Sequence, residues 1–166
     1  MTAFDTAWGI VKMPIVQGSV QRNHDLSGLP NLPSNFKRYS AEFDDPITGE
    51  RMNMAANFDP EQSIYAFIDD PKYEDTRAGG NFRGFPSGIF ERPRFEATKI
   101  DTDEDYRRRG YGTGIYDLVA YILDRHGADL MPSTDQTKAG EALWDSVLSN
   151  LEDDEPQRWR VRGDLG

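Results

Sequence analysis

The chain has 166 residues, enough for one domain that buries a substantial hydrophobic core. It carries 29 acidic and 19 basic residues, two histidines and no cysteine. This composition excludes disulfide frameworks, thiolate metal sites and histidine-rich zinc sites, and its net charge of −10 disfavours non-specific binding to nucleic acid. No apolar run is long enough to cross a bilayer and no secretory signal is recognisable, so we expect a soluble, cytoplasmic protein without a metal, membrane or nucleic-acid partner.

The N-terminal residues 1–36 are predicted to form an arm in front of the domain. A short helix is expected before Pro14, which ends it. From 17 to 35 the sequence is rich in Gly, Pro, Ser and Asn, which is typical of an extended segment. The arm either packs on the domain, which we expect to span 37–166, or reaches towards a protein partner.

An antiparallel meander is predicted for the first part of the domain. Apolar residues alternate over 37–43 and again over 51–58, and the turn-forming DDPITGE lies between the two runs. A third strand, SIYAFID, follows at 63–69 after another turn. We therefore expect a hairpin extended by one more strand.

Residues 69–88 are predicted to be a long loop, because they are rich in turn formers and show no clear periodicity. The loop carries Tyr73, Phe82 and Phe85. These aromatic side chains either line a substrate entrance or pin an Ω-like loop by packing on one another. Acidic residues around the loop favour a cationic substrate.

The second half of the chain is predicted to alternate strands and helices. An apolar stripe predicts a helix over 114–126, with Gly127 as its C-cap. Ser133 and Gln136 have the spacing of a capping box for a second helix, which ends near Leu151. Strands are expected at 92–101, 128–131 and 157–163.

The turn before the first of these helices has the composition of an anion site. Three arginines precede Gly110, Gly112 and Gly114, and the apolar helix follows at once. Helix N-termini bind anions through unpaired N–H groups and the macrodipole, and glycine lets a phosphate approach the backbone. The spacing excludes a Walker loop and a dinucleotide fingerprint. A solvated charge run that balances Asp103–Asp105 would explain the arginines, but not the glycines.

The string Arg107-Arg108-Arg109-Gly110-Tyr111-Gly112 resembles the Arg/Gln-x-x-Gly-x-Gly/Ala acetyl-CoA signature of the GNAT superfamily of N-acyltransferases. The resemblance covers about residues 88–150. It implies an α+β (mixed α/β) fold, in which a mostly antiparallel twisted sheet is flanked by helices and preceded here by the extended arm. It also implies an N-acetyltransferase that uses acetyl-CoA as co-substrate and acts on a small-molecule amine or a protein amino group.

Carried over to this chain, the resemblance implies that backbone N–H groups from Arg108 to Gly114 hold the CoA pyrophosphate. Arg107 begins the loop, one of Arg108 or Arg109 reaches a phosphate, and the other faces solvent. The strand end at Ile100–Thr102 would pair with the pantetheine arm. The implied cofactor-binding residues are Ile100, Asp101, Thr102, Arg107, Arg108, Arg109, Gly110, Tyr111, Gly112, Thr113 and Gly114.

The catalytic groups are less sharply indicated. Glu96 or Asp101, on the strand before the loop, could act as the base, although each also fits an ordinary exposed strand carboxylate. The family's tyrosine acid corresponds here to Trp144, which has no suitable proton to give. A second hypothesis is therefore a catalytically silent GNAT-fold protein with a binding or structural role, such as a phage virion or assembly component located in the virus particle.

Overall fold

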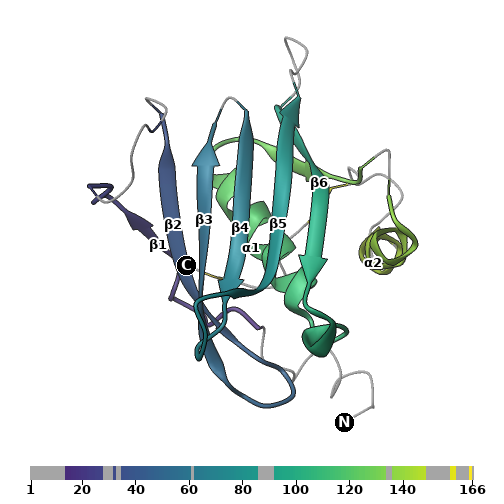
Figure 1. The fold of residues 1–166 in the computed structure, drawn as a ribbon. Coiled ribbons are helices and arrows are strands. Elements are labelled where there is room, and N and C mark those ends of the chain that lie inside the picture. The colour runs from purple at the N-terminus through teal and green to yellow at the C-terminus, as the bar shows by residue number, and fades with distance from the viewer. Residues whose placement is uncertain are drawn as a thin grey trace.

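The computed structural model describes residues 14–27, 32, 35–60, 62–85, 92–133, 136–148, 158–159 and 165. They form a seven-stranded sheet whose strands lie side by side in chain order, from β1 to β7 (Figure 1). The strands are β1 (Gln21–Asn23), β2 (Lys37–Asp44), β3 (Arg51–Asp59), β4 (Ser63–Asp69), β5 (Thr76–Phe85), β6 (Arg94–Thr102) and β7 (Asp129–Met131). The helices are η2 (Glu104–Tyr106), α1 (Tyr111–Arg125) and α2 (Lys138–Leu148).

Neighbouring strands from β1 to β6 pair antiparallel, whereas β7 runs parallel to β6. The expected mixed, mostly antiparallel sheet is therefore confirmed. The parallel pair requires a crossover, and α1 supplies it by packing on one face of the sheet, against β4 and β5. Alternating buried residues of the strands, such as Phe43, Met54 and Ile68, form the core together with Leu118 and Ile122 of α1.

The predicted loop over 69–88 is wrong, because half of it is the ten-residue strand β5, and 86–88 lie outside the described residues. The glycines of β5 are typical of turns, and the sequence therefore does not predict this strand. In the fold they leave space for neighbouring side chains. A Cβ atom at Gly80 would lie 2.6 Å from Ile100 Cδ1, and one at Gly84 would lie 2.9 Å from the Phe95 ring. The glycines are therefore packing positions of a central strand rather than signs of a loop.

The described part of the N-terminal arm packs on the domain. Ile15 is buried in the core and forms an isolated antiparallel bridge with Phe43, while β1 adds an edge strand beside β2. Ser19 Oγ also accepts a hydrogen bond from the backbone N–H of Glu42 at 3.0 Å. The helix predicted before Pro14 lies outside the described residues.

The elements after β6 agree with the prediction in kind and differ at their boundaries. Helix α1 begins at Tyr111, three residues before the predicted start. Its C-cap is His126, and the predicted cap, Gly127, is the next residue and has a left-handed φ of 71°. The capping box at Ser133 is wrong, because α2 begins at Lys138 and the residue before it, Thr137, accepts the Gly140 N–H through Oγ1 at 3.1 Å. Trp159 N donates to Leu130 O at 2.8 Å, and the remainder of the predicted last strand lies outside the described residues.

Candidate anion-binding site

The chain between β6 and α1 turns sharply through two left-handed residues. Arg108 has a φ of 63° and Gly110, the N-cap of α1, has a φ of 85°. No side chain caps the helix, and the backbone N–H groups of 108–113 have no acceptor among the described residues. Six consecutive donors at the positive end of a helix form a cradle for an anion. We call residues 108–113 the N–H cradle.

The three glycines of this segment have different structural reasons. Gly110 takes the left-handed conformation that glycine adopts at least cost. Gly112 faces open space, because a Cβ atom there would meet no atom within 4 Å. At Gly114 a Cβ atom would lie 2.5 Å from Phe43 Cε2, and the Gly114 N–H already donates to Gly110 O at 2.9 Å. The available donors therefore end at Thr113, and Gly114 is a packing residue.

The structure separates the three arginines. Arg107 Nε donates to the Thr102 carbonyl at 3.0 Å, which ties it back to the end of β6. Arg109 Nη1 lies 3.4 Å from Asp45 Oδ2 and is only partly exposed. Arg108 is exposed and has no side-chain partner among the described residues. Of the two arginines left open by the sequence, Arg108 is therefore the one available to a ligand.

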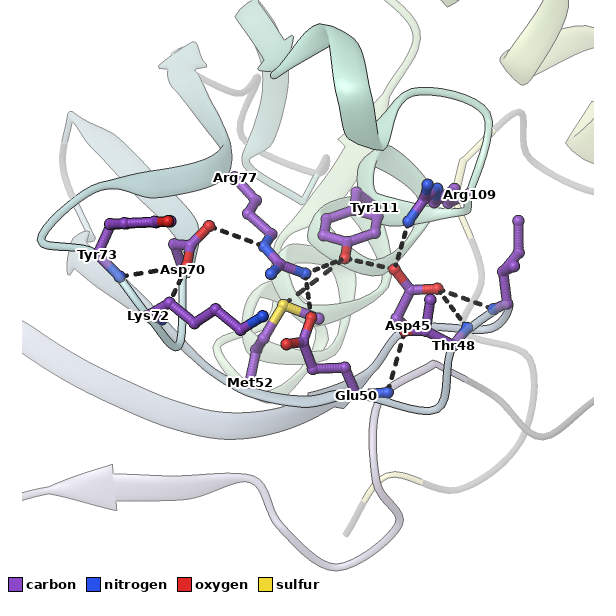
Figure 2. Close-up of polar contacts among 11 residues, drawn as sticks. Asp45, Thr48, Glu50, Met52, Asp70, Lys72, Tyr73, Arg77, Arg109 and Tyr111 are labelled. Carbon is purple, nitrogen blue, oxygen red and sulfur yellow. Dashed lines mark hydrogen bonds and ion pairs between the residues drawn. The ribbon is translucent and has the colours of Figure 1, made fainter.

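The side chain of Tyr111 points away from the cradle into a buried polar cluster. Its hydroxyl donates to Asp45 Oδ2 at 2.7 Å and accepts from Arg77 Nη1 at 3.1 Å (Figure 2). Burial and the hydrogen bond to Asp45 raise the pKa of Tyr111, so the phenol stays protonated. Sequence reasoning missed Asp45 and Arg77, because they lie 66 and 34 residues from Tyr111 and no local pattern connects them.

The strand end predicted to bind pantetheine lies on an edge of β6 that β7 leaves open. β7 pairs only with Arg94–Glu96, so no described strand lies beside 97–102 on that side. A bulge at Thr98 interrupts the pairing with β5, and Thr98 Oγ1 donates to Asn81 O at 3.2 Å. The side chain of Ile100 turns towards the core, whereas Asp101 is exposed. The open edge therefore leads from the N–H cradle back to Glu96.

The two candidate bases occupy different environments. Glu96 is buried and pairs with Met131 at the last position shared by β6 and β7, where the open edge begins. Asp101 is exposed and forms a surface ion pair with Lys99 at 3.1 Å. Five residues of strand separate them, or about 16 Å. Only Glu96 therefore lies at the point where the two strands diverge.

Trp144 is part of the core. Its ring makes edge contacts with Tyr116 and Trp159, at centroid distances of 5.7 and 5.2 Å. Contacts among the three rings pack α2 and Trp159 against α1. An indole in this place has no proton to give to a departing thiolate.

The aromatic residues proposed to line a substrate entrance do not gather. Phe82 is buried in the core, Tyr73 is exposed in the β4–β5 turn, and Phe85 lies at the far end of β5. A hollow of about 560 Å³ does lie at this turn, and several of its lining residues are acidic: Asp69, Asp70, Glu74 and Asp75. It lies near Thr76, whereas Glu96 pairs with Arg83, seven residues and about 23 Å farther along β5. The hollow is therefore remote from the divergence of β6 and β7.

Comparison with known proteins shows likeness to solved structures only at low sequence identity. No described helix is long and apolar enough to cross a membrane, and no group of acidic or histidine side chains in the described ranges could hold a metal ion. No protein-family model matches the chain, and no curated protein matches it significantly in sequence. Among solved structures, it is similar to an aminoglycoside acetyltransferase from an uncultured soil metagenomic sample, with 14% identity, a TM-score of 0.45, and coverage of 64% of this chain and 69% of that one.

Proposed function

We propose that the protein binds acetyl-CoA and transfers its acetyl group to an amine. The observation that carries this proposal is the N–H cradle at 108–113, which opens around Gly112 and directly follows the open edge of β6. A diphosphate is the anion that such a run of donors suits, because several oxygens can accept at once. Arg108 adds a charge-assisted hydrogen bond from the exposed side of the loop.

The open edge of β6 supports a thioester carrier rather than a simple phosphate. The pantetheine arm contains amide groups, and an unpaired strand edge offers them the N–H and C=O partners that another strand would use. An arm lying along 97–102 runs from the N–H cradle towards Glu96. This direction places the thioester carbonyl near the divergence of β6 and β7.

The acyl transfer itself is simple to write. The amine nitrogen attacks the thioester carbonyl, a C–N bond forms, the C–S bond breaks, and CoA leaves as a thiolate. Glu96, buried beside this point, takes the proton that the amine loses, directly or through water. Because Trp144 cannot serve as the acid, the thiolate takes its proton from solvent.

Thiol release tests this function directly. The chain has no cysteine, so a thiol-specific dye reports only the CoA that the reaction releases. We expect acetyl-CoA and a primary amine, either a diamine or a peptide with a free N-terminus, to release thiol in the presence of the protein. Glu96→Gln should lower kcat by about 10²–10⁴-fold and leave the Kd for acetyl-CoA unchanged. The matched control Asp101→Asn, on the exposed part of the same strand, should retain kcat; equal rates for Glu96→Gln and the wild type would exclude Glu96 as the base.

A non-catalytic acyl-CoA-binding protein is the second candidate. The buried indole of Trp144 favours it, since the position that the resemblance assigns to an acid is here part of the core. A fold does not guarantee its family's chemistry. Binding of acetyl-CoA without thiol release to any amine would support this second candidate over the first.

A further inference from the structure

A cluster of polar side chains lies beneath the N–H cradle, on the side away from any ligand. Its centre is Tyr111, whose hydroxyl donates to Asp45 Oδ2 and accepts from Arg77 Nη1, at 2.7 and 3.1 Å (Figure 2). The three residues are almost completely enclosed: Asp45 and Tyr111 are 1% exposed and Arg77 is 4% exposed. Their side chains bond to one another, so apart from the backbone N–H of Tyr111 the proposed chemistry gives them no direct role.

Arg77 connects three separate parts of the chain. Its guanidinium lies 2.6 Å from Glu50 Oε1, in the β2–β3 turn, and 3.0 Å from Asp70 Oδ2, in the β4–β5 turn. The ring of Tyr106, in η2, lies 4.1 Å from the guanidinium carbon, which is a cation–π contact. The Arg77 carbonyl also accepts the Asp103 N–H at 2.8 Å, where the loop leaves β6. Arg77 therefore fixes the start of the loop through both its backbone and its side chain.

Asp45 fixes the other end of the loop. Its Oδ1 accepts the N–H groups of Ile47 and Thr48 at 2.8 and 3.1 Å, which orients the carboxylate within its own turn. Its Oδ2 receives the Tyr111 hydroxyl and Arg109. Burial opposes ionisation of Asp45, but these hydrogen bonds outweigh burial and hold its pKa below the ordinary value. A charged Asp45 thus connects a rigid turn to both Arg109 and the first residue of α1.

The net charge of the cluster does not favour the binding of an anion. Two cations, Arg77 and Arg109, face three carboxylates, those of Asp45, Glu50 and Asp70. Buried ion pairs often stabilise a fold less than an apolar replacement would, so stability alone does not explain this cluster. Its geometry offers another reason, since its contacts hold η2, the loop and the first turn of α1 against two turns of the sheet.

We propose that Asp45, Arg77 and Tyr111 are positioning residues of the N–H cradle. They hold 106–113 in the conformation that leaves the six N–H groups without a described acceptor and keeps Arg108, between two bonded arginines, available to the ligand. The ligand part of this inference rests on the proposed binding of acetyl-CoA. The conformational part concerns the loop alone and is measurable without a ligand.

The direction in which one substitution changes the Kd for acetyl-CoA distinguishes a positioning role from an effect of charge. Asp45→Asn removes a negative charge close to the cradle and releases Arg109. If Asp45 acted only through its charge, this variant would bind acetyl-CoA more tightly. Positioning predicts the opposite, a Kd higher by on the order of tenfold, because the cradle must be ordered again on binding. Tighter or unchanged binding by Asp45→Asn would overturn the ligand part of the proposal.

Tyr111→Phe is the second variant, since it retains the buried ring and removes the hydroxyl alone. Amide hydrogen exchange without ligand should accelerate in both variants at the hydrogen-bonded amides that flank the cradle, those of Tyr106, Arg107 and Gly114, and stay at the wild-type rate in β4. The control is Tyr39→Phe, which removes another buried hydroxyl, bonded to His126 Nε2 at 2.8 Å near the opposite end of α1. It should change neither the exchange of these three flanking amides nor the Kd.

The binding and hydrogen-exchange measurements test the two parts of the proposal independently. If the wild type does not bind acetyl-CoA, the proposed function and the ligand part of the inference fall, and hydrogen exchange alone decides whether the cluster positions the loop. If the wild type binds but both variants retain wild-type exchange at the amides of Tyr106, Arg107 and Gly114, the positioning role is wrong and the proposed function stands.

Discussion

At the scale of single residues, Arg108 is unusual in its backbone. It is the one non-glycine residue of the described ranges with a positive φ, at 63°. This conformation costs a side-chain-bearing residue on the order of 1 kcal/mol, and such residues concentrate at ligand sites. Its neighbours Arg107 and Arg109 are both tied to the protein. Arg108 therefore combines backbone strain with an unpaired charge.

This combination predicts that stability and ligand affinity separate in Arg108→Gly. Glycine adopts a positive φ without strain, so the free energy of unfolding should be retained or rise by up to about 1 kcal/mol. The Kd for acetyl-CoA should rise about tenfold or more, because a charge-assisted hydrogen bond is lost. Urea unfolding and calorimetric titration measure the two quantities. A loss of more than about 1 kcal/mol of stability, or an unchanged Kd, would contradict the role given to Arg108.

At the scale of elements, the first turn of α1 contains two glycines with opposite surroundings. Gly112 faces open space, whereas Gly114 lies against the ring of Phe43 on β2. The same substitution should therefore have opposite effects at positions two residues apart. Gly114→Ala should destabilise the protein by about 1–3 kcal/mol, because the added methyl group must displace a buried aromatic ring.

Gly112→Ala is the matched control for this prediction. It should be neutral or stabilising by up to about 1 kcal/mol, because alanine is the better helix former and its methyl group meets no neighbour. Chemical unfolding of both variants measures the difference. Equal effects at the two positions would mean that α1 does not approach β2 as closely as the structure has it.

The strands and helices also differ in how far the sequence predicts them. Strands β2 and β3 carry the alternating patterns that predict them, and β4, β6 and β7 are also predicted from the sequence. The sequence does not predict β5, because its glycines are also typical turn residues. In the fold these glycines leave space for the side chains of Ile100 and Phe95. The start of α1 was placed three residues late for the same reason, since the helix begins within a glycine-rich turn.

At the scale of the whole molecule, the antiparallel order of the strands brings distant turns to one end of the sheet. The β2–β3 turn, the β4–β5 turn and the loop after β6 all lie at that end (Figure 1). The motif at Arg107–Gly112 indicated an anion site from six residues alone. The support beneath it, from Asp45 and Arg77, depends on strand order and was beyond any local pattern.

The overall charge sets the background for ligand binding. A protein of net charge −10 repels polyanions at long range, yet a compact anion can still be held by backbone dipoles over a short distance. Because most donors of the N–H cradle belong to the backbone, the acidic surface does not prevent binding there. Binding of acetyl-CoA at this cradle is thus the central claim, and turnover depends on it.

The most direct measurement of that claim is the thermal unfolding of three proteins with and without acetyl-CoA. The wild type should be stabilised by about 2.7 kcal/mol at a ligand concentration one hundred times the Kd. Gly112→Trp should unfold like the wild type without ligand and gain nothing from it, because the indole fills the open space of the cradle. Ala142→Trp, which adds an indole at an exposed position of α2, should respond like the wild type. No stabilisation of the wild type at millimolar acetyl-CoA, or an undiminished response of Gly112→Trp, would contradict the account.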